Sequence, residues 1–258
     1  MSSAGGVPTD HAVPVLDGAP LFLLDELPDG EVLTVGGPEG RHAVDVLRLT
    51  PGERVRVGNG RGLVAEGMVR AAGPDGLQVE VAVRHEVPEP APTLVLVQAL
   101  PKGERGPLAV ELATELGVDR VVPWTAARCV TKWRDDRVDK GLAKWRSAAR
   151  AASKQARRPR VPEVTAPMST RQVCGLLADV DLALVLHEQA HRPLAGLSVP
   201  ATGTIAVVVG PEGGLTDGEV VAFRAAGAQA VRLGAEVLRT STAGAAALAA
   251  LSAKTRWV

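Results

Sequence analysis

Three short segments combine glycine, carboxylate and arginine residues directly after runs of apolar residues. They are Leu186-His187-Glu188, Gly210-Pro211-Glu212-Gly213-Gly214-Leu215 and Leu233-Gly234-Ala235-Glu236-Val237-Leu238-Arg239-Thr240. If the apolar runs are parallel strands, these segments leave the carboxyl edge of a sheet, where glycine turns let backbone amides approach a cofactor closely. The segments therefore predict one cofactor site. The alternatives are a tight turn without a ligand at the glycine pair and a core ion pair for Arg239.

The second segment is the strongest of the three. It leaves the apolar run 204–209 and enters a predicted helix, whose start carries Thr216 and Glu219 at the spacing of a capping box. A near copy of the segment at residues 36–40 joins no apolar strand to a capped helix. We interpret that copy as a turn.

Residues His187 to His191 spell H-E-x-x-H, the zinc peptidase string whose two histidines must share one helical face. The context argues against this interpretation, because apolar residues before His187 predict a strand and Pro193 would interrupt a helix soon after its start. We therefore predict no metal site. The sequence also lacks a G-x-G-x-x-G after the first strand of this region and a Walker loop, so ordinary dinucleotide and ATP sites are not expected.

Strands and helices alternate from residue 93 onward. Continuous apolar runs predict strands that are buried on both faces, which favours a mostly parallel sheet covered by helices. Between residues 138 and 156, apolar residues recur at spacings of three and four and predict one buried helical face. The predicted strands are 93–99, 118–123, 181–186, 204–209 and 230–233, and the predicted helices are 107–117, 138–156, 217–226 and 242–254.

The first part of the chain has a different pattern. Short strand-like runs at 21–24, 54–57, 63–70 and 77–83 are separated by glycine and proline turns and predict a small β-barrel, with one short helix at 42–49. Residues 86–92 alternate proline with short spacers, and we interpret them as the boundary between two domains. The predicted fold class is α/β, with a β-barrel domain at 1–90 and a mostly parallel α/β domain at 91–258.

Basic residues are concentrated in one part of a chain that has no net charge. The sequence contains 29 Lys plus Arg and 29 Asp plus Glu, yet residues 128–160 contain twelve basic residues against three aspartates, a net charge of +9. Such a strip is typical of a protein that binds the phosphate backbone of a nucleic acid, and a solvated helix face is the alternative. With aromatic residues at 2%, a surface of many stacked rings is not expected.

Composition excludes several classes of protein. The chain of 258 residues is 46% apolar, which excludes a disordered protein, and no apolar run approaches the roughly 20 residues that cross a bilayer. Residues 1–10 lack the pattern of a secretory signal, so a cytoplasmic location is expected. Cys129 and Cys174 are too few for a disulfide framework and are expected to be reduced, structural thiols.

Taken in order, the motifs resemble those of the RsmE family, the 16S ribosomal RNA (uracil-3)-methyltransferases of the SPOUT superfamily. The resemblance covers nearly the whole chain. The amino-terminal part is similar to the family's PUA-like RNA-binding barrel, and the three segments described above are similar to its cofactor loops. The further motifs that carry the resemblance are residues 42–53 (HAVDVLRLTPGE), Gly58-Asn59-Gly60, residues 98–102 (QALPK), residues 111–118 (ELATELGV), and Gln155 with Arg158, Val161 and Pro162.

The resemblance implies S-adenosylmethionine as the cofactor, a carboxyl-terminal trefoil knot, a homodimer, and 16S ribosomal RNA or the small ribosomal subunit as the partner. For methylation of uridine ring nitrogen 3, we interpret Glu212 or Glu236 as the proton acceptor and Arg239 as the group that stabilises the uracil oxyanion. The residues expected to bind the cofactor are Leu186, His187, Glu188, Gly210, Pro211, Glu212, Gly213, Gly214, Leu233, Gly234, Val237, Leu238 and Thr240. The residues expected to bind RNA are Arg41, Arg48, Lys102, Arg146, Arg150, Lys154, Arg157 and Arg158.

The chain departs from the family pattern at three places. Ser241 and Leu112 stand where a Glu and a Lys are common, and Ala156-Arg157 replaces a small residue followed by Gly.

Two other functions remain as alternatives. One is a knotted methyltransferase that acts on another RNA position, in transfer RNA or on a ribose oxygen. The other is an RNA-binding assembly factor without catalysis, which the absence of cofactor binding would distinguish.

Overall fold

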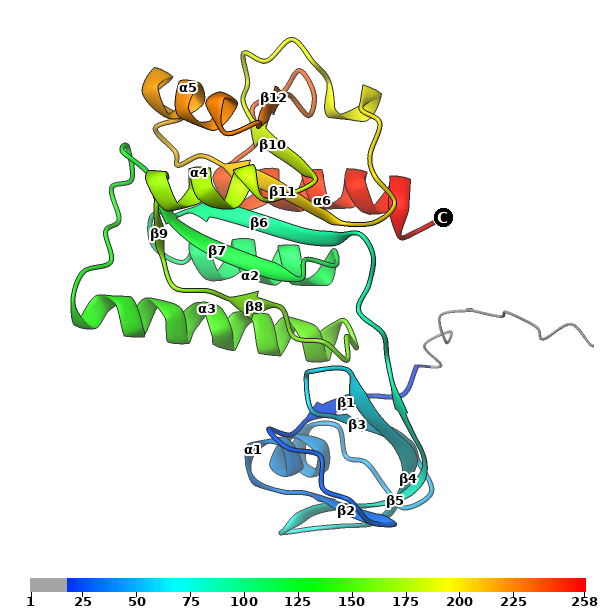
Figure 1. Ribbon diagram of the computed structural model, residues 1–258. Coiled ribbons are helices and arrows are strands. Elements are labelled where there is room, and N and C mark those ends of the chain that lie inside the picture. Colours follow the sequence, from blue (N-terminus) through cyan, green and yellow to red (C-terminus); the bar gives the residue numbers. More distant parts are fainter. Residues whose placement is uncertain (1–17) are drawn as a thin grey trace, which may run out of the picture.

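The computed structural model describes residues 18–258, which form two sheets with separate hydrophobic cores. Figure 1 shows the two sheets one above the other, with a long helix between them. The predictions made for residues 1–17, namely the lack of a secretory signal and the start of the first domain, lie outside the described residues. Within residues 18–258, no helix is long and apolar enough to cross a membrane.

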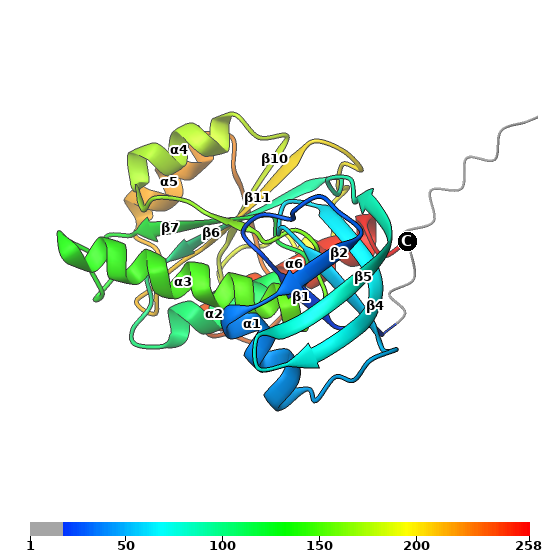
Figure 2. The ribbon, with the colours of Figure 1, turned by 90° about the horizontal axis from the view of Figure 1, so that it is seen from below.

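The first sheet has five strands in the order β1-β3-β4-β5-β2 and is strongly curved (Figure 2). All of its pairs are antiparallel except β1 with β3. The four predicted strands are confirmed, and β2 was not predicted. The strands are β1 (Leu21–Leu23), β2 (Val32–Val35), β3 (Arg54–Gly58), β4 (Leu63–Gly73) and β5 (Gly76–Glu86).

The glycine-rich copy at residues 36–40 is helical, so its interpretation as a turn is wrong. Helix α1 (Gly37–Arg41) continues into a π-helical turn, η1 (His42–Val46), which is shorter than the predicted helix at 42–49. Pro38 lies in the first helical turn, a position that proline favours. A Cβ on Gly40 would lie 2.3 Å from the carbonyl oxygen of Val35, so glycine is what allows this helix to pack against the sheet.

The second sheet is parallel throughout, as predicted. Its strands run in the order β12-β10-β11-β6-β7-β8, and β9 also pairs with β7. The five predicted strands are confirmed, and the missed strands β8 and β9 have only two residues each. The strands are β6 (Thr93–Ala99), β7 (Arg120–Thr125), β8 (Glu163–Val164), β9 (Met168–Ser169), β10 (Leu182–Leu186), β11 (Thr204–Val209) and β12 (Gln229–Val231).

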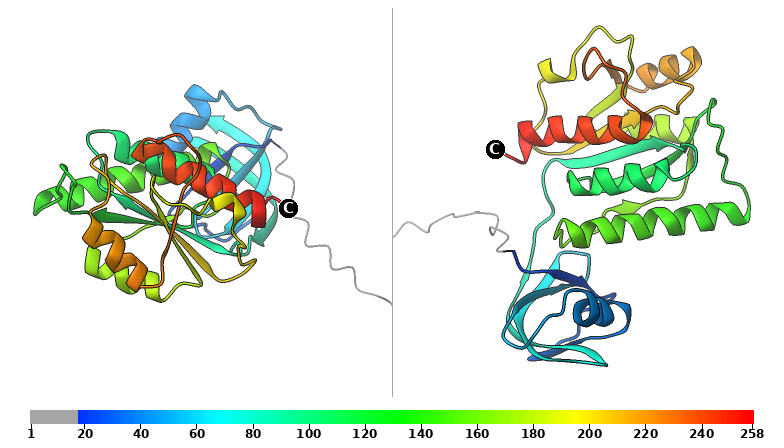
Figure 3. Two further views of the ribbon diagram at one scale, coloured as in Figure 1. Left: turned by 90° about the horizontal axis from the view of Figure 1, so that it is seen from above. Right: turned by 180° about the vertical axis from the view of Figure 1, so that it is seen from behind.

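Helices cover both faces of the parallel sheet, with three on one face and two on the other (Figures 2 and 3). The first group is α2 (Arg105–Glu115), α3 (Asp136–Gln155) and α6 (Thr240–Thr255), and the second is α4 (Thr170–Ala178) and α5 (Asp217–Ala225); a short 3-10 turn, η2 (Leu194–Gly196), follows β10. The predicted buried face of α3 is confirmed by Leu142, Trp145, Ala149 and Ala152. Helix α4 was missed, although its capping box at Ser169 is a sequence signal.

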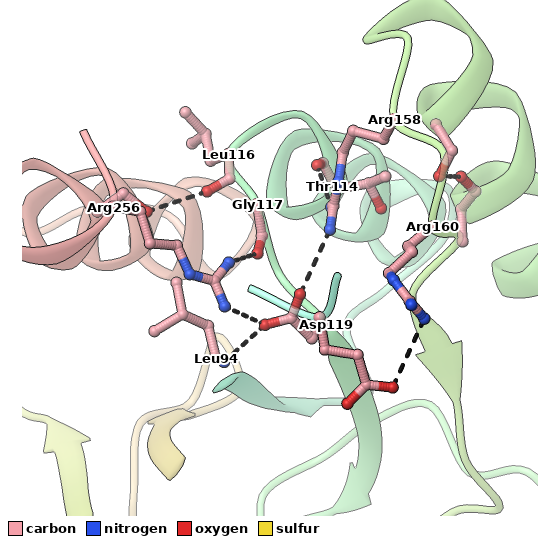
Figure 4. Close-up of polar contacts among 12 residues, drawn as sticks. Leu94, Thr114, Leu116, Gly117, Asp119, Arg158, Arg160 and Arg256 are labelled. Carbon is pink, nitrogen blue, oxygen red and sulfur yellow. Dashed lines mark hydrogen bonds and ion pairs between the residues drawn. The ribbon is translucent and has the colours of Figure 1, made fainter. Parts of the chain in front are cut away.

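A partly buried carboxylate, that of Asp119, lies at the amino-terminal edge of the parallel sheet (Figure 4). Asp119 accepts the N–H of Leu94 at 2.8 Å and pairs with the guanidinium groups of Arg158 and Arg256. Burial lowers the pKa of Arg158 to about 10, and the charge of Asp119 opposes that shift. Arg158 therefore stays protonated near neutral pH. The cluster holds the ends of α3 and α6 against the starts of β6 and β7.

Helix α3 also contacts the first sheet. Arg150 donates a hydrogen bond to the carbonyl oxygen of Leu23 at 2.5 Å and pairs with Asp25 at 3.3 Å. Lys154 pairs with Glu39 at 2.7 Å, and the side chains of both are mostly buried. The long helix between the two sheets therefore joins them by charged contacts.

Helix α3 ends in a Schellman motif with an unusual residue. The N–H of Arg157 donates to the Lys154 carbonyl at 3.0 Å and the N–H of Arg158 to the Ser153 carbonyl at 2.7 Å, which is the pattern of that motif. Arg157 adopts φ of 55°, the left-handed region in which glycine is usual. The arginine therefore occupies a strained backbone position.

We expect Arg157→Gly to raise the free energy of unfolding by about 0.5–1 kcal/mol. Glycine adopts the left-handed conformation without the steric cost that arginine has there, and the larger conformational entropy that glycine loses on folding offsets only part of this gain. Urea unfolding followed by tryptophan fluorescence measures the difference. Arg157→Ala is the matched control, since it removes the same charge but keeps the Cβ. If the glycine variant is no more stable than the alanine variant, the backbone at residue 157 is not strained and the prediction is wrong.

Candidate functional site

The three segments singled out in the sequence meet at the carboxyl edge of the parallel sheet. They follow β10, β11 and β12, which are neighbours in the sheet, and together with residues after β6 and β7 they line a cavity of about 690 Å³. Every residue assigned to cofactor binding or catalysis from the sequence lines this cavity. Its volume lies within the range of about 300–1,000 Å³ that is usual for small-molecule sites.

One buried hydroxyl connects three elements of the cavity wall. Thr240 donates a hydrogen bond to the carbonyl oxygen of Gly210 at 2.8 Å and accepts one from Nε2 of Gln98 at 3.0 Å. Both Gln98 and Thr240 are buried. The end of β6, the loop after β11 and the start of α6 are therefore held at fixed spacing. The sequence placed Thr240 in the site, whereas the role of Gln98 became evident only in the structure.

Glu212 is bound to the loop that follows β6. Its Oε1 accepts hydrogen bonds from the backbone N–H of Lys102 at 3.0 Å and from Arg105 at 3.2 Å. Desolvation acts to raise the pKa of Glu212, but these hydrogen bonds and the charge of Arg105 outweigh it and lower the pKa. Glu212 is therefore a carboxylate at neutral pH, and a weak base.

Two further side chains join the segment after β7 to the loop after β11 and the start of α5. Arg128 donates to the carbonyl oxygens of Gly213 and Leu215, each at 3.0 Å. Glu219 is 5% exposed, accepts the N–H of Ala127 at 2.7 Å, and completes the predicted capping box of α5. Sequence reasoning counted Arg128 only as part of the basic strip. Its place directly after a strand of the parallel sheet was the signal that could have assigned it to the site.

Glu236 and Arg239 lie on the exposed loop between β12 and α6. Neither side chain has an ion-pair partner or a side-chain hydrogen bond in the part of the chain that the structure describes. The alternative of a core ion pair for Arg239 is therefore wrong. A carboxylate and a guanidinium, both without partners, face one cavity, which suits them to bind or ionise a ligand.

The H-E-x-x-H string does not form a helix. The N–H of His187 donates to the carbonyl oxygen of Val231 at 2.9 Å, beside the end of β10, and residues 188–193 form turns. The predicted strand before His187 is confirmed. Nδ1 of His187 accepts the N–H of Gln189 at 3.2 Å, which leaves the ring proton on Nε2 when the ring is neutral. Residues 18–258 contain no cluster of three or more His, Cys, Asp or Glu side chains with the spacing of a metal site.

The basic strip divides into two parts. Towards its carboxyl end, Arg146 donates to the carbonyl oxygen of Val164, and the predicted RNA-binding residues Arg150, Lys154 and Arg158 make the contacts described above. Towards its amino end, exposed basic side chains have no ion-pair partner among residues 18–258; they are Lys132, Arg134 and Arg137. Arg41, Arg48 and Lys102 are also exposed, and the RNA-binding role of the whole set stays a prediction.

Comparison with known proteins assigns the family. A model of the RNA methyltransferase domain matches residues 88–252, and a model of the RNA methyltransferase PUA domain matches residues 35–82. Ribosomal RNA small subunit methyltransferase E of Mycobacterium bovis is 47% identical over 245 residues, which cover 93% of this chain and 94% of that protein. The chain belongs to the ribosomal RNA small subunit methyltransferase E family.

More distantly related proteins align over nearly the same length. The Bacillus subtilis protein is 28% identical, with 89% of this chain and 93% of that protein covered. The crystal structure of methyltransferase E from Neisseria gonorrhoeae, bound to S-adenosylmethionine, has a TM-score of 0.80 at 28% identity and covers 92% of this chain and 98% of that one. A Legionella pneumophila protein in complex with the same cofactor has a TM-score of 0.77 at 29% identity, covering 92% and 97%.

We expect Thr240→Val to lower the free energy of unfolding by about 1–3 kcal/mol, because the amide of Gln98 and the carbonyl of Gly210 both lose a buried partner. Chemical denaturation measures this loss. Thr242→Val is the matched control, since the Thr242 hydroxyl contacts the carbonyl of Arg239 at 3.2 Å on an exposed part of the same helical turn. Equal losses in the two variants would show that the buried Thr240 hydroxyl contributes no more to the free energy of unfolding than the exposed Thr242 hydroxyl.

Proposed function

We propose that this protein transfers a methyl group from S-adenosylmethionine to ring nitrogen 3 of a uridine in 16S ribosomal RNA of the small subunit. The observation that carries the proposal is the meeting of three loop segments around one cavity at the carboxyl edge of the parallel sheet. Membership of the methyltransferase E family supports it. So does the Neisseria gonorrhoeae structure, which contains the cofactor and has the same fold.

The residues around the cavity suit S-adenosylmethionine. Gly214 has φ of 71° and is followed by the buried Leu215, so the backbone of this loop turns without a side chain in the way. The carboxylate of Glu188 can accept hydrogen bonds from the ribose hydroxyls or the amino group, and Val237 and Leu238 offer apolar surface for the adenine. When bound, the cofactor supplies an electrophilic methyl group on a sulfonium.

Two exposed side chains provide the chemistry at the uracil. A uracil ring nitrogen that carries a proton is a poor nucleophile, so a base must accept the proton as the nitrogen bonds to the methyl carbon. Glu236 is the better candidate, because Glu212 already accepts two hydrogen bonds and has a lowered pKa. Arg239 would pair with the negative charge that the uracil oxygens gain. The loops position both reactants, which accounts for a large part of the acceleration.

The remaining parts of the proposal concern the assembly. Residues 1–90 would bind RNA and residues 91–258 would carry the catalytic site. The path of the chain from β12 at the sheet edge to α6, which lies over β6 and β11, supports the carboxyl-terminal knot. A homodimer and a cytoplasmic location, where ribosomal subunits are assembled, complete the proposal.

Mass spectrometric mapping of 16S RNA tests the function directly. Small subunits from a strain that lacks the modification are incubated with the purified protein and S-adenosylmethionine. We expect one uridine to gain a methyl group on ring nitrogen 3. A methyl group on a ribose oxygen, or methylation of transfer RNA instead, would favour the related knotted methyltransferases. Calorimetry without any cofactor binding would favour a non-catalytic assembly factor.

We expect Arg239→Ala and Glu236→Gln each to slow single-turnover methylation by about 100-fold, the usual order for loss of a charge-stabilising group or a general base. Glu212→Gln is the matched control, since it neutralises a carboxylate of the same cavity. In that variant, cofactor affinity should fall because the loop contact to Lys102 weakens, while the rate with saturating cofactor changes much less. The assignment fails if Glu212→Gln slows the chemical step more than Glu236→Gln.

A further inference from the structure

A second cavity of about 260 Å³ is lined by residues that are close in the chain to Arg105 and Arg128 of the cofactor cavity, although no described residue lines both. Two loops, which follow β6 and β7, separate the cavities. Arg105 and Arg128 line the cofactor cavity, whereas the nearby Glu104 and Thr131 line the second one. The hydroxyl of Thr131 donates to the carbonyl oxygen of Pro101 at 2.8 Å and ties the two loops together. A molecule in the second cavity would therefore lie next to the proposed methylation site.

Two tryptophans form one side of this second cavity. The rings of Trp133 and Trp145 are edge to face, with centroids 5.2 Å apart and an angle of 77°. Each ring lies against a glycine, since a Cβ on Gly141 would be 2.4 Å from the Trp133 ring and a Cβ on Gly106 would be 2.6 Å from Nε1 of Trp145. Any larger residue at either glycine would displace a ring. Trp133 is partly exposed and presents aromatic surface.

Trp145 carries a polar group that the protein does not use. The residue is only 2% exposed and its indole N–H donates no hydrogen bond within residues 18–258, but the nitrogen is not among the fully buried polar atoms that lack a partner, so it is open to the cavity. Because Trp145 lines the cavity, an acceptor atom on a bound molecule could accept a hydrogen bond from this N–H.

Basic side chains lie beside the second cavity, interleaved with acidic ones. Lys132, Arg134 and Arg137 follow Thr131 in the chain, are exposed, and lack ion-pair partners in the described part of the protein, and the exposed Asp135, Asp136 and Asp139 lie among them, so residues 132–139 carry no net charge. Lys144 lines the cavity itself and pairs with the exposed Glu104 at 3.2 Å. Basic side chains beside an aromatic surface are the usual combination in proteins that bind unpaired RNA.

We propose that the second cavity binds one unpaired nucleobase of the substrate RNA, close to the target uridine. The base would stack on Trp133, accept a hydrogen bond from the indole of Trp145, and leave its phosphates near Lys132, Arg134 and Arg137. The cavity is smaller than sites for drug-sized ligands and suits a single base. This inference rests on the proposed function in one respect, namely that the substrate is RNA.

Tryptophan fluorescence tests the stacking without disturbing the pocket. The experiment uses the full chain with Trp257→Phe, because Trp257 is 58% exposed and would otherwise add a signal of its own. We expect an unpaired RNA oligonucleotide of mixed sequence to quench the fluorescence, and a fully paired duplex of the same length to quench it much less. Equal quenching by the two, or no quenching by either, would overturn the proposal.

Steady-state kinetics test the contribution to substrate binding. We expect Trp133→Leu to raise the KM for small subunits about tenfold, within the range of roughly 5- to 150-fold expected for one lost stacking contact. The turnover number and the calorimetric affinity for S-adenosylmethionine should stay within about twofold. Trp133→Phe should restore most of the lost affinity, and Trp257→Leu is the matched control.

The outcomes separate this inference from the proposed function. Suppose that the parent protein methylates RNA, but Trp133→Leu leaves KM unchanged or weakens cofactor binding as much as RNA binding. The nucleobase site is then rejected, and the proposed function stands. If the parent protein methylates no RNA but unpaired RNA still quenches its fluorescence, the function fails and the pocket stands. Should Trp133→Leu not fold, the fluorescence comparison alone decides.

Discussion

Asp119 places one carboxylate between two arginines at the amino-terminal edge of the parallel sheet. A charge that is largely withdrawn from solvent needs compensation, which Asp119 supplies to Arg158 and Arg256 together with the backbone carbonyls that both guanidinium groups contact. Because one guanidinium follows α3 and the other follows α6, the same carboxylate fixes the ends of two helices. Helix α6 begins at the opposite edge of the sheet, where Thr240 contacts Gly210 (Figure 3). The cluster at one edge thus helps to hold the cavity at the other.

Polar side chains at the cavity have two distinct tasks. One group binds backbone atoms and keeps the loops in place, and its members are buried or already hydrogen bonded, as Gln98, Arg128 and Glu212 are. The other group, Glu236 and Arg239, is exposed and lacks partners within the described residues. Arg128 and Glu212 hold the loop after β11, and Gln98, through Thr240, anchors the end of the neighbouring loop that carries Glu236 and Arg239. Anchoring of this kind lowers the entropic cost of positioning the two charges for catalysis.

Helix α3 shows why a count of charges does not identify a binding surface. The +9 strip is continuous in the sequence, but in the structure its carboxyl-terminal half joins the two sheets through Arg150 and Lys154. In the amino-terminal half, Arg134 and Arg137 are exposed and have no ion-pair partner in residues 18–258, but all three aspartates of the strip lie among them. That half adjoins the tryptophan cavity. The same run of residues therefore has one structural part and one part that is available to a ligand.

The sequence by itself determined the parallel sheet, the buried face of α3 and the three loop segments, because apolar periodicity and glycine punctuation act over short distances. It misjudged residues 36–40, where packing of Gly40 against Val35 stabilises a helix. It also missed α4 and the short strands β2, β8 and β9, whose patterns are brief. Only the tertiary structure decided which polar groups have partners. The contact of Gln98 with Thr240 spans 142 positions, and no local pattern encodes a pairing over that separation.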